Sequence, residues 1–451
     1  MSNRGKVLDL FEAQKDVWEE QAARGIEAYR KGDAKLTVTD RKGNPLSDVK
    51  VTVKQKSHEF RFGINLLLVD EMDTPEKAER YESLIRDSFN MGTVPFYWKT
   101  LEPERGKSRY EKGSPYCYRR PAIDTCVDLC NRLGIEPREH ALAYEHFFPD
   151  WLYDKEVDEI KKEMERHYAE ISERYANKMH TIEVTNEMYW KNGKTKFFDA
   201  FDYVEWCFKT AEKYFPNNQL VVNETTPLCW DDTCRVTDKY YAYIEANLLK
   251  GVKIDAIGMQ YHMFYKSEQE YEETRPYYNP KNLYAHMDLY SNLNKPLQIT
   301  EVTVPAYSND PEDEELQAEI LEKLYRIWFS HPNVEQIVYW NLIDGYAYVS
   351  DPDPAKIAAT KGDMSVGENY YYGGLVRYDM TPKPAFYKLR ELIQKTWHTE
   401  ETLSTDAEGR TEFRGFYGDY EVNLRRNGKS ITRTITLSSK EKNNFCFVLS
   451  R

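Results

Sequence analysis

The sequence predicts an α/β protein: a (β/α)8 TIM barrel with a small accessory β-sandwich built from the N- and C-terminal segments. Two observations predict this fold. Short apolar runs alternate with amphipathic stretches through the middle of the chain, which is the pattern of repeated strand–helix units. In addition, the 451 residues exceed the roughly 250 that one barrel typically needs, so a second module is expected.

The barrel is expected to span residues 62–398, because this segment contains eight short apolar runs, the number that a closed barrel requires. Three long polar inserts, 102–121, 263–285 and 345–373, interrupt the alternation. Loops that follow barrel strands form the face where ligands bind, so we expect these inserts at the mouth of the barrel. The expected strands are residues 62–67, 91–98, 135–142, 181–187, 219–224, 255–261, 296–301 and 335–342.

The two ends of the chain are expected to fold outside the barrel. Residues 1–34 are charged and amphipathic and predict a helix over 6–31, and the alternating apolar positions of 35–61 predict a β-hairpin. Residues 399–451 alternate in the same way, with Asn427-Gly428 as a typical hairpin turn. Because neither end has enough strands to cover its own apolar face, both are predicted to join in one sandwich.

Composition and charge exclude several kinds of partner. The formal net charge of −13 argues against nucleic acid, because phosphate binding needs a basic face. The chain has no run of about 18 apolar residues, so no membrane contact is expected. The first residues are charged and carry no apolar signal core, so a cytoplasmic location is expected. The sequence does not determine the oligomeric state.

Residue types point away from a metal and toward a sugar. The seven cysteines form no CxxC pair and the nine histidines form no HxH or HExxH motif, so we expect no metal and no cofactor. The chain also contains 35 tyrosines and 9 tryptophans. Most should fill the core, but aromatic faces with a polar edge suit sugar rings. The composition is therefore compatible with a carbohydrate ligand.

Two glutamates, Glu187 and Glu301, stand at the ends of the fourth and seventh expected strands. A parallel barrel brings strand-end residues together at one mouth. Two carboxylates that face a sugar across a cleft are the groups that glycoside hydrolysis requires, one neutral as proton donor and the other ionised. These two side chains are therefore the candidate catalytic pair.

Six motifs follow one another in the order found in a known enzyme family. Residues 182–187 resemble W-D-x-x-N-E, residues 299–303 resemble I-T-E-x-D, and residues 258–262 match G-x-Q-x-H. Further matches are residues 138–145 with R-G-H-x-L-x-W-H, Trp340 and Asp344 with W-G-x-x-D, and residues 382–385 with P-K-P-A. Over residues 62–397 the chain thus resembles glycoside hydrolase family 10, the xylanase family of retaining barrel enzymes.

The resemblance implies roles for individual residues. Glu187 would be the acid/base and Glu301 the nucleophile, with Asn186 donating to a sugar 2-hydroxyl. A donor or cation such as His262 beside Glu301 is expected to lower the pKa of that carboxyl. Further substrate-binding residues by resemblance are His140, Gln260, His262, Trp340 and Trp98.

The chain departs from the family pattern where xylanases contact xylose. On the second strand the family's Lys is replaced by Tyr97, and after the third strand its Trp and His are replaced by Tyr144 and Glu145. Tyr348 stands in register with a second family Trp. Leaving a buried polar group without its partner costs about 1–3 kcal/mol, so these changes disfavour an ordinary xylanase. The four replacement residues are nevertheless expected to line the substrate site.

The sequence leaves more than one function open. The favoured interpretation is a retaining β-glycoside hydrolase that acts on imported oligosaccharides or glycosylated small molecules. One alternative is an endo-1,4-β-xylanase with rebuilt subsites, and another is a non-catalytic carbohydrate-binding protein on the same fold. A metal-dependent hydrolase is disfavoured, although His140, Glu145 and His146 lie close in sequence.

Overall fold

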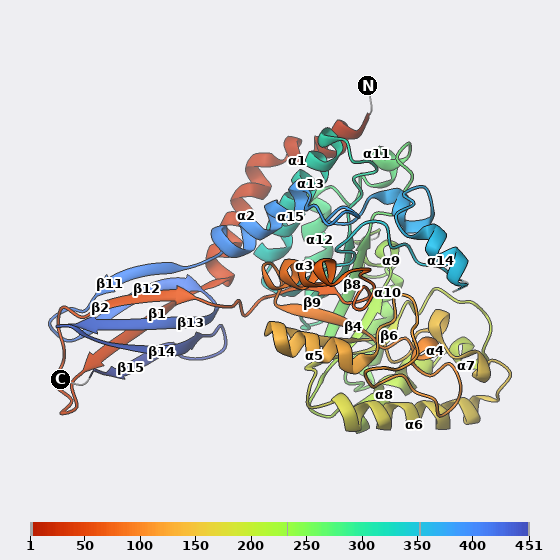
Figure 1. The fold of residues 1–451 in the computed structure, drawn as a ribbon, viewed down its shortest axis with the longest axis horizontal. Helices are drawn as coiled ribbons and strands as arrows, with labels where there is room; N and C mark the ends of the chain where they lie inside the picture. Colours follow the sequence, from red (N-terminus) through yellow and green to blue (C-terminus); the bar gives the residue numbers. More distant parts are fainter. Residues whose placement is uncertain (1–2, 232, 351–352, 450–451) are drawn as a thin grey trace.

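The computed structural model describes residues 3–231, 233–350 and 353–449, and it contains the predicted closed barrel (Figure 1). The parallel strands pair in the order β10-β3-β4-β5-β6-β7-β8-β9, and β10 closes on β3. Strands of such a barrel are buried on both faces, which explains their continuous apolar runs. The strands are β3 (Arg61–Asn65), β4 (Met91–Pro95), β5 (Glu136–His140), β6 (Thr181–Asn186), β7 (Gln219–Glu224), β8 (Ala256–His262), β9 (Leu297–Thr303) and β10 (Val334–Tyr339).

Amphipathic helices surround the barrel. In α5 (Ile123–Leu133) the buried positions include Cys126 and Cys130 on one face, and the helix ends at Gly134, whose φ of 67° suits a left-handed cap. The other helices around the barrel are α3 (Pro75–Arg86), α6 (Val157–Tyr175), α8 (Tyr203–Tyr214), α10 (Lys239–Leu249), α12 (Pro280–Ser291), α13 (Pro311–Ser330) and α15 (Pro384–Glu391). Short helices in the loops are α4 (Trp98–Leu101), α7 (Lys196–Asp199), α9 (Thr226–Trp230), α11 (Glu270–Glu273) and α14 (Pro354–Thr360). Within the described residues, every helix is too short or too polar to cross a membrane.

The predicted single helix over 6–31 is wrong in detail. The segment forms a 3₁₀ turn (Asn3–Leu8), α1 (Asp9–Ala13) and α2 (Lys15–Tyr29), with a break at Gln14. The chain enters β1 (Lys31–Thr39) directly after α2. The break lets Phe11 and Trp18 pack edge to face, with ring centroids 5.9 Å apart. Residues 1–2 of the N-terminal segment 1–34 lie outside the described residues.

The two ends of the chain form the accessory sandwich, whose two sheets have the orders β12-β1-β15 and β11-β2-β13-β14. The predicted turn at Asn427-Gly428 joins β13 and β14, which pair antiparallel. The sheets enclose an apolar core that includes Val51, Val53 and Leu424. The strands not yet given are β2 (Lys50–Gln55), β11 (Glu400–Ser404), β12 (Arg410–Phe416), β13 (Gly418–Arg426), β14 (Lys429–Leu437) and β15 (Asn444–Val448).

The predicted hairpin within 35–61 is wrong. β1 pairs with β12 and β15, whereas β2 pairs with β11 and β13 in the other sheet. The apolar positions of both strands, such as Val38 and Val51, face one shared core from opposite sides. Alternation in sequence predicts the buried face of each strand but not its hydrogen-bonded partner, which here comes from the far end of the chain.

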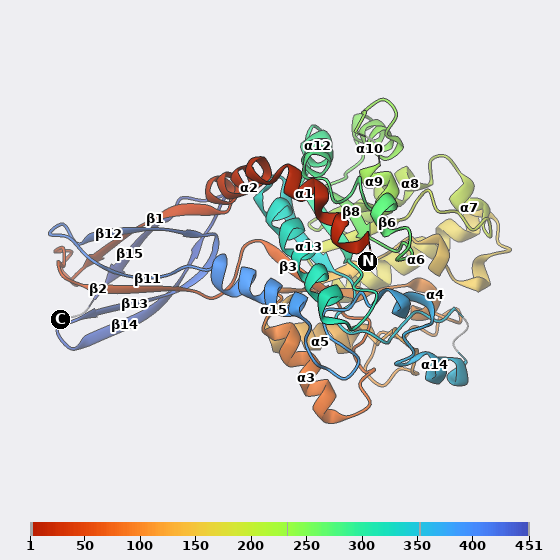
Figure 2. The same cartoon turned by 90° about the horizontal axis from the view of Figure 1, so that it is seen from above.

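The sandwich lies at the amino ends of the barrel strands, beside α2 and α15 (Figures 1 and 2). β3 begins at Arg61, six residues after β2 ends at Gln55. The ring of Phe416 at the end of β12 lies 6.2 Å from that of Phe329 near the end of α13, just before β10. The sandwich therefore abuts the end of the barrel opposite to the carboxyl ends of the strands.

Candidate active site

A cavity of about 650 Å³ opens at the carboxyl ends of the barrel strands. Both Glu187 and Glu301 line it, as the strand-end argument predicts. Residues from all three long inserts also line it, among them Arg120, Phe264 and Glu368; residues 351–352 of the third insert lie outside the described residues. The other predicted site residues that line this cavity are Tyr97, His140, Tyr144, Asn186, Gln260, His262, Trp340 and Tyr348.

Glu301 on β9 is buried and accepts two hydrogen bonds. Asn223 donates from Nδ2 to one carboxylate oxygen at 3.0 Å, and His262 lies with Nε2 3.1 Å from the other. Burial raises the pKa of Glu301 to about 8, and the charges of Glu183 and Glu187 act in the same direction, while His140 opposes them. This carboxyl thus binds its proton far more tightly than a glutamate in water.

The expectation that His262 lowers the pKa of Glu301 is wrong. Burial lowers the pKa of His262 to about 4, so the imidazole is neutral near pH 7. With Nε2 protonated, it donates to Glu301 while Nδ1 accepts from the Thr303 hydroxyl, 3.0 Å away. A single neutral donor does not offset the desolvation of a buried carboxylate.

Glu187 follows β6 and is held by two donors. The Tyr144 hydroxyl donates to Oε2 at 2.6 Å, and Gln260 donates from Nε2 to Oε1 at 3.0 Å. The backbone of Glu187 has φ of 52°, in the left-handed region, and its N–H donates to the carbonyl of Asn223 at 3.1 Å. Non-glycine residues in this region are uncommon and cluster at functional sites. The backbone geometry thus marks Glu187 independently of any motif.

A chain of amides connects the two carboxylates. Asn186 Oδ1 accepts from Gln260 Nε2 at 3.2 Å and from Asn223 Nδ2 at 3.0 Å. Gln260 also contacts Glu187, and Asn223 also contacts Glu301. Sequence reasoning missed Asn223, although an amide within the apolar run of β7 was a signal for it. These three amides fix the two carboxylates relative to each other.

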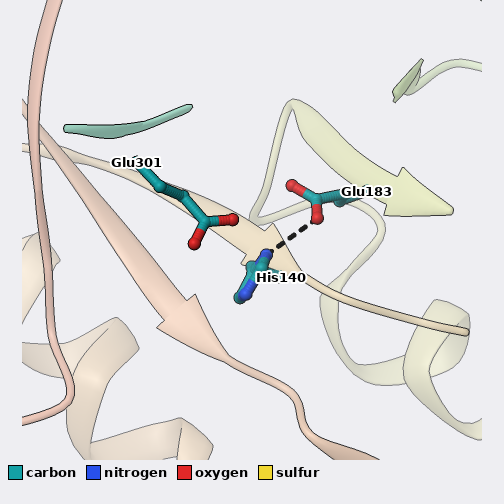
Figure 3. Close-up of side chains that lie close together, drawn as sticks. All are labelled: His140, Glu183 and Glu301. Atoms are coloured by element: carbon teal, nitrogen blue, oxygen red, sulfur yellow. Dashed lines mark hydrogen bonds and ion pairs between the residues drawn. The ribbon is translucent and has the colours of Figure 1, made fainter. Parts of the chain in front are cut away.

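Below Glu301 lies a buried ion network (Figure 3). His140 Nδ1 lies 2.8 Å from Glu183, which also accepts from Arg138. Although burial opposes both charges, the partners hold the pKa of Glu183 below and that of His140 above its usual range. Glu183 thus favours the charged form of His140, whose Nε2 lies 3.0 Å from the Tyr97 hydroxyl and whose positive charge lowers the pKa of Glu301.

His140, Glu183 and Glu301 offer ligand atoms within 4.8 Å of one another, close enough for a metal ion. A metal would need a neutral imidazole, whereas Glu183 raises the pKa of His140 and thereby favours its charged form, and Nδ1 already contacts Glu183. The chemistry of this set therefore matches an ion pair beside a buried carboxyl better than a metal centre.

Two predicted site residues, Trp98 and Glu145, are not among the described residues that line the cavity. Trp98 is buried; its ring stacks on His167 at 4.1 Å and its indole N–H donates to Glu102. Glu145 accepts from the backbone N–H of Asn192 at 3.1 Å.

The next residue along the chain, His146, lines the cavity in place of Glu145. The segment Glu145–Phe147 forms a 3₁₀ turn, and this turn presents His146 rather than Glu145 to the cavity. Its Nε2 is buried and has no hydrogen-bond partner among the described residues. A linear alignment cannot reveal this one-residue change, because it arises from the local turn.

Aromatic side chains form the walls of the cavity. Trp340 packs edge to face against His140 and His262, with ring centroids 5.5 and 5.8 Å away. Trp190, three residues after Glu187, is 60% exposed at the rim and was missed by sequence reasoning. Exposed aromatic rings at a cavity rim suit the apolar faces of sugars. The cavity thus combines acids at its floor with stacking surfaces at its walls.

Comparisons with known proteins agree with these motifs. The family model described as "Glycosyl hydrolase family 10" matches residues 55–391. The anti-sigma-I factor RsgI6 of Acetivibrio thermocellus is 25% identical over 96% of this chain, and the chain spans about half (49%) of that protein. A beta-1,4-xylanase of Dictyoglomus thermophilum is 24% identical over 60% of this chain and 75% of its own length.

Solved structures agree on the fold. The xylanase 10B of Thermotoga petrophila, solved in complex with xylobiose, superposes with a TM-score of 0.57 at 20% identity, over 75% of this chain and 95% of that one. Because the family model covers most of the barrel and includes both strand-end glutamates, the chain belongs to glycosyl hydrolase family 10.

Proposed function

We propose that this protein is a retaining β-glycoside hydrolase that works by double displacement, with Glu301 as nucleophile and Glu187 as acid/base. One observation carries the proposal: two carboxylates from different strands line one cavity and are joined by the hydrogen-bonded amides of Gln260, Asn186 and Asn223. A protein that only bound sugar would not need such a matched pair of acids.

The first step forms a covalent intermediate. The ionised Glu301 attacks the anomeric carbon as the bond from this carbon to the leaving oxygen breaks, and Glu187 gives its proton to that oxygen. In the second step Glu187 takes a proton from water, and the water oxygen displaces Glu301 from the sugar. Two inversions at one carbon retain the β configuration.

The neighbours of Glu301 suit this role although its pKa is raised. His262 and Asn223 orient the two oxygens, and the imidazolium of His140 supplies a positive charge nearby. Since attack requires the ionised form, kcat/KM of the free enzyme should rise with pH up to about 8.

The proposed substrates are short β-linked oligosaccharides or glycosylated small molecules, taken up into the cytoplasm. Tyr97, Phe147 and Tyr348 form an aromatic wall, with ring centroids 4.4 Å apart between Tyr97 and Phe147. In the xylanases that this chain resembles, hydrogen-bond donors bind xylose at this place. Here the aromatic wall replaces those donors. A xylanase with rebuilt subsites is the second candidate, because the relatives quoted above include a named xylanase.

The test is a panel of aryl β-glycosides (xyloside, glucoside, galactoside and arabinoside) with the wild type, Glu301→Ala and Glu187→Ala. Glu314→Gln serves as a matched control, because Glu314 is also buried but pairs with Arg377 outside the cavity lining. Proton NMR of the first product anomer reports retention, and a 2-fluoro glycoside should label Glu301, as read by mass spectrometry. Turnover that survives Glu301→Ala would remove that residue from its role. Binding without turnover on any substrate would favour a sugar-binding protein.

A further inference from the structure

Arg120 lies in the cavity wall and is only 6% exposed. Its guanidinium stacks over Tyr97 at 4.1 Å and Phe147 at 4.9 Å, and lies 5.8 Å from the ring of Tyr348. Nη1 donates to the backbone carbonyl of Arg119 at 2.8 Å, whereas Nε is buried without a hydrogen-bond partner. Aromatic rings hold the group in place and leave most of its donors unused.

Arg120 has no ion-pair partner of its own among the described residues, although Glu368 lies near enough to interact with its charge. Neighbouring Arg119 forms an ion pair with Glu368 at 3.0 Å, and Glu368 also lines the cavity. Among the described residues, no carboxylate lies within ion-pair distance of Arg120. Buried charges in proteins are normally paired, because the loss of hydration is otherwise uncompensated. Glu368 thus pairs directly with Arg119, and the guanidinium of Arg120 keeps unused donors for a ligand.

The position of Arg120 in the cavity indicates which part of a bound substrate it faces. If Glu187 protonates the leaving oxygen, as the proposed function requires, the leaving group lies on the β6–β7 side, near Trp190 and Pro227. Arg120 lies on the other side, against Tyr97, which follows β4. The Tyr97 hydroxyl contacts His140, which is close to Glu301. Arg120 therefore faces the glycone, the sugar that is transferred to the enzyme.

We propose that Arg120 binds a carboxylate on the glycone side, so that the cavity takes a uronic acid or a sugar chain that carries one. This inference rests on the proposed function for the orientation of the substrate in the cavity. The negative charge of the ligand is inferred from Arg120 and does not depend on the proposed function. The planar guanidinium matches a carboxylate in bidentate geometry. A phosphate ester carries nearly two negative charges and is the competing ligand, so the test below includes one.

Binding of non-hydrolysable monosaccharides tests the inference without any turnover. Calorimetry should compare glucuronate and galacturonate with glucose and galactose on the wild type, Arg120→Gln and Arg120→Lys. We expect the uronates to bind more tightly than their neutral counterparts, and Arg120→Gln to weaken uronate binding by about 10- to 100-fold. Arg120→Lys should recover part of the loss, because it keeps the charge but not the planar fork. Arg174→Gln is the matched control, since Arg174 also stacks on a tyrosine, Tyr110, but outside the cavity lining.

Each outcome decides between distinct conclusions. Uronates that bind no more tightly than neutral sugars, or that bind equally well to Arg120→Gln, would overturn the inference. Glucose 6-phosphate that binds more tightly than glucuronate, in a manner that depends on Arg120, would replace the carboxylate with a phosphate. Failure of the proposed function has a different signature: no aryl glycoside is turned over, while Arg120-dependent uronate binding persists. A matching kinetic comparison is the kcat/KM ratio of aryl β-glucuronide to aryl β-glucoside, which Arg120→Gln should lower.

Discussion

The cavity and the accessory sandwich lie at opposite ends of the barrel and are held together by opposite kinds of interaction. The cavity floor buries Glu301, Glu183 and His140, and each depends on specific partners for its charge state. The sandwich core is made of apolar side chains such as Val53 and Leu424, which contribute through burial alone. If the cavity is the active site, as proposed, the chemistry depends on buried charge at one end, and we expect the stability of the other end to change without altering that chemistry.

The largest expected effect is on activity, at the cavity. Glu301→Ala should lower kcat/KM by about 10⁴-fold or more, equal to roughly 5.5 kcal/mol, because no other group can form the glycosyl intermediate. Sodium azide should partly restore turnover of an activated aryl glycoside and give the α-glycosyl azide, since azide enters the space left by the carboxylate. Steady-state kinetics and NMR of the product check this. Recovery of a β-product would contradict the assignment of Glu301 as nucleophile.

The next effect is on stability, at the sandwich. Leu424→Ala removes a fully buried side chain and should lower the free energy of unfolding of the sandwich by about 2–5 kcal/mol. Because the sandwich is remote from the cavity, kcat at a temperature where the protein stays folded should match the wild type. Chemical denaturation and kinetics on the same sample measure both. The exposed neighbour Arg425 provides a control, since Arg425→Ala should change neither. A large loss of kcat in Leu424→Ala would show that the two ends are coupled.

A smaller effect concerns the pH dependence. Asn223→Ala removes a donor to the ionised form of Glu301, so the pKa of that carboxyl should rise above its value of about 8. The acidic limb of kcat/KM should move to higher pH, with a loss of about 10-fold at pH 6 and a smaller loss at pH 9. The pH–rate profile measures the shift. Asn247→Ala is the matched control, because Asn247 is also buried but lies on α10. An unshifted profile would mean that Asn223 only supports the fold.

The smallest effect combines stability with pH. The folded pKa of Glu301, about 8, lies above its ordinary value of 4.5, so protonation favours the folded state. This contribution is complete below about pH 4.5 and is lost as pH rises through 8. Glu301→Gln cannot ionise, and its Tm should exceed that of the wild type by about 2 °C at pH 9 and by less at pH 5. Calorimetric scans at both pH values test this, and Leu424→Ala should show an equal deficit at each.

The barrel and the presence of Glu187 and Glu301 in one cavity were predictable from the sequence for local reasons. Eight apolar runs of strand length that alternate with helices can be recognised from the periodicity of the sequence alone. Glu187 and Glu301 were found because each ends such a run. Trp98 and Glu145 were assigned by linear register, and the structure places both outside the described cavity lining because Trp98 packs on His167 and a 3₁₀ turn presents His146 instead.

The sequence by itself determined which residues alternate, where turns fall and which strands end on an acid. Only the tertiary structure decided that β1 and β2 belong to different sheets, that Asn223 connects the two carboxylates, and that Arg120 lacks an acidic partner among the described residues. The physical reason is that pairing, burial and charge balance depend on side chains brought together from distant segments. The raised pKa of Glu301 is the clearest case, since burial and the negative charges of Glu183 in β6 and of Glu187 after it outweigh the positive charges that come from β5.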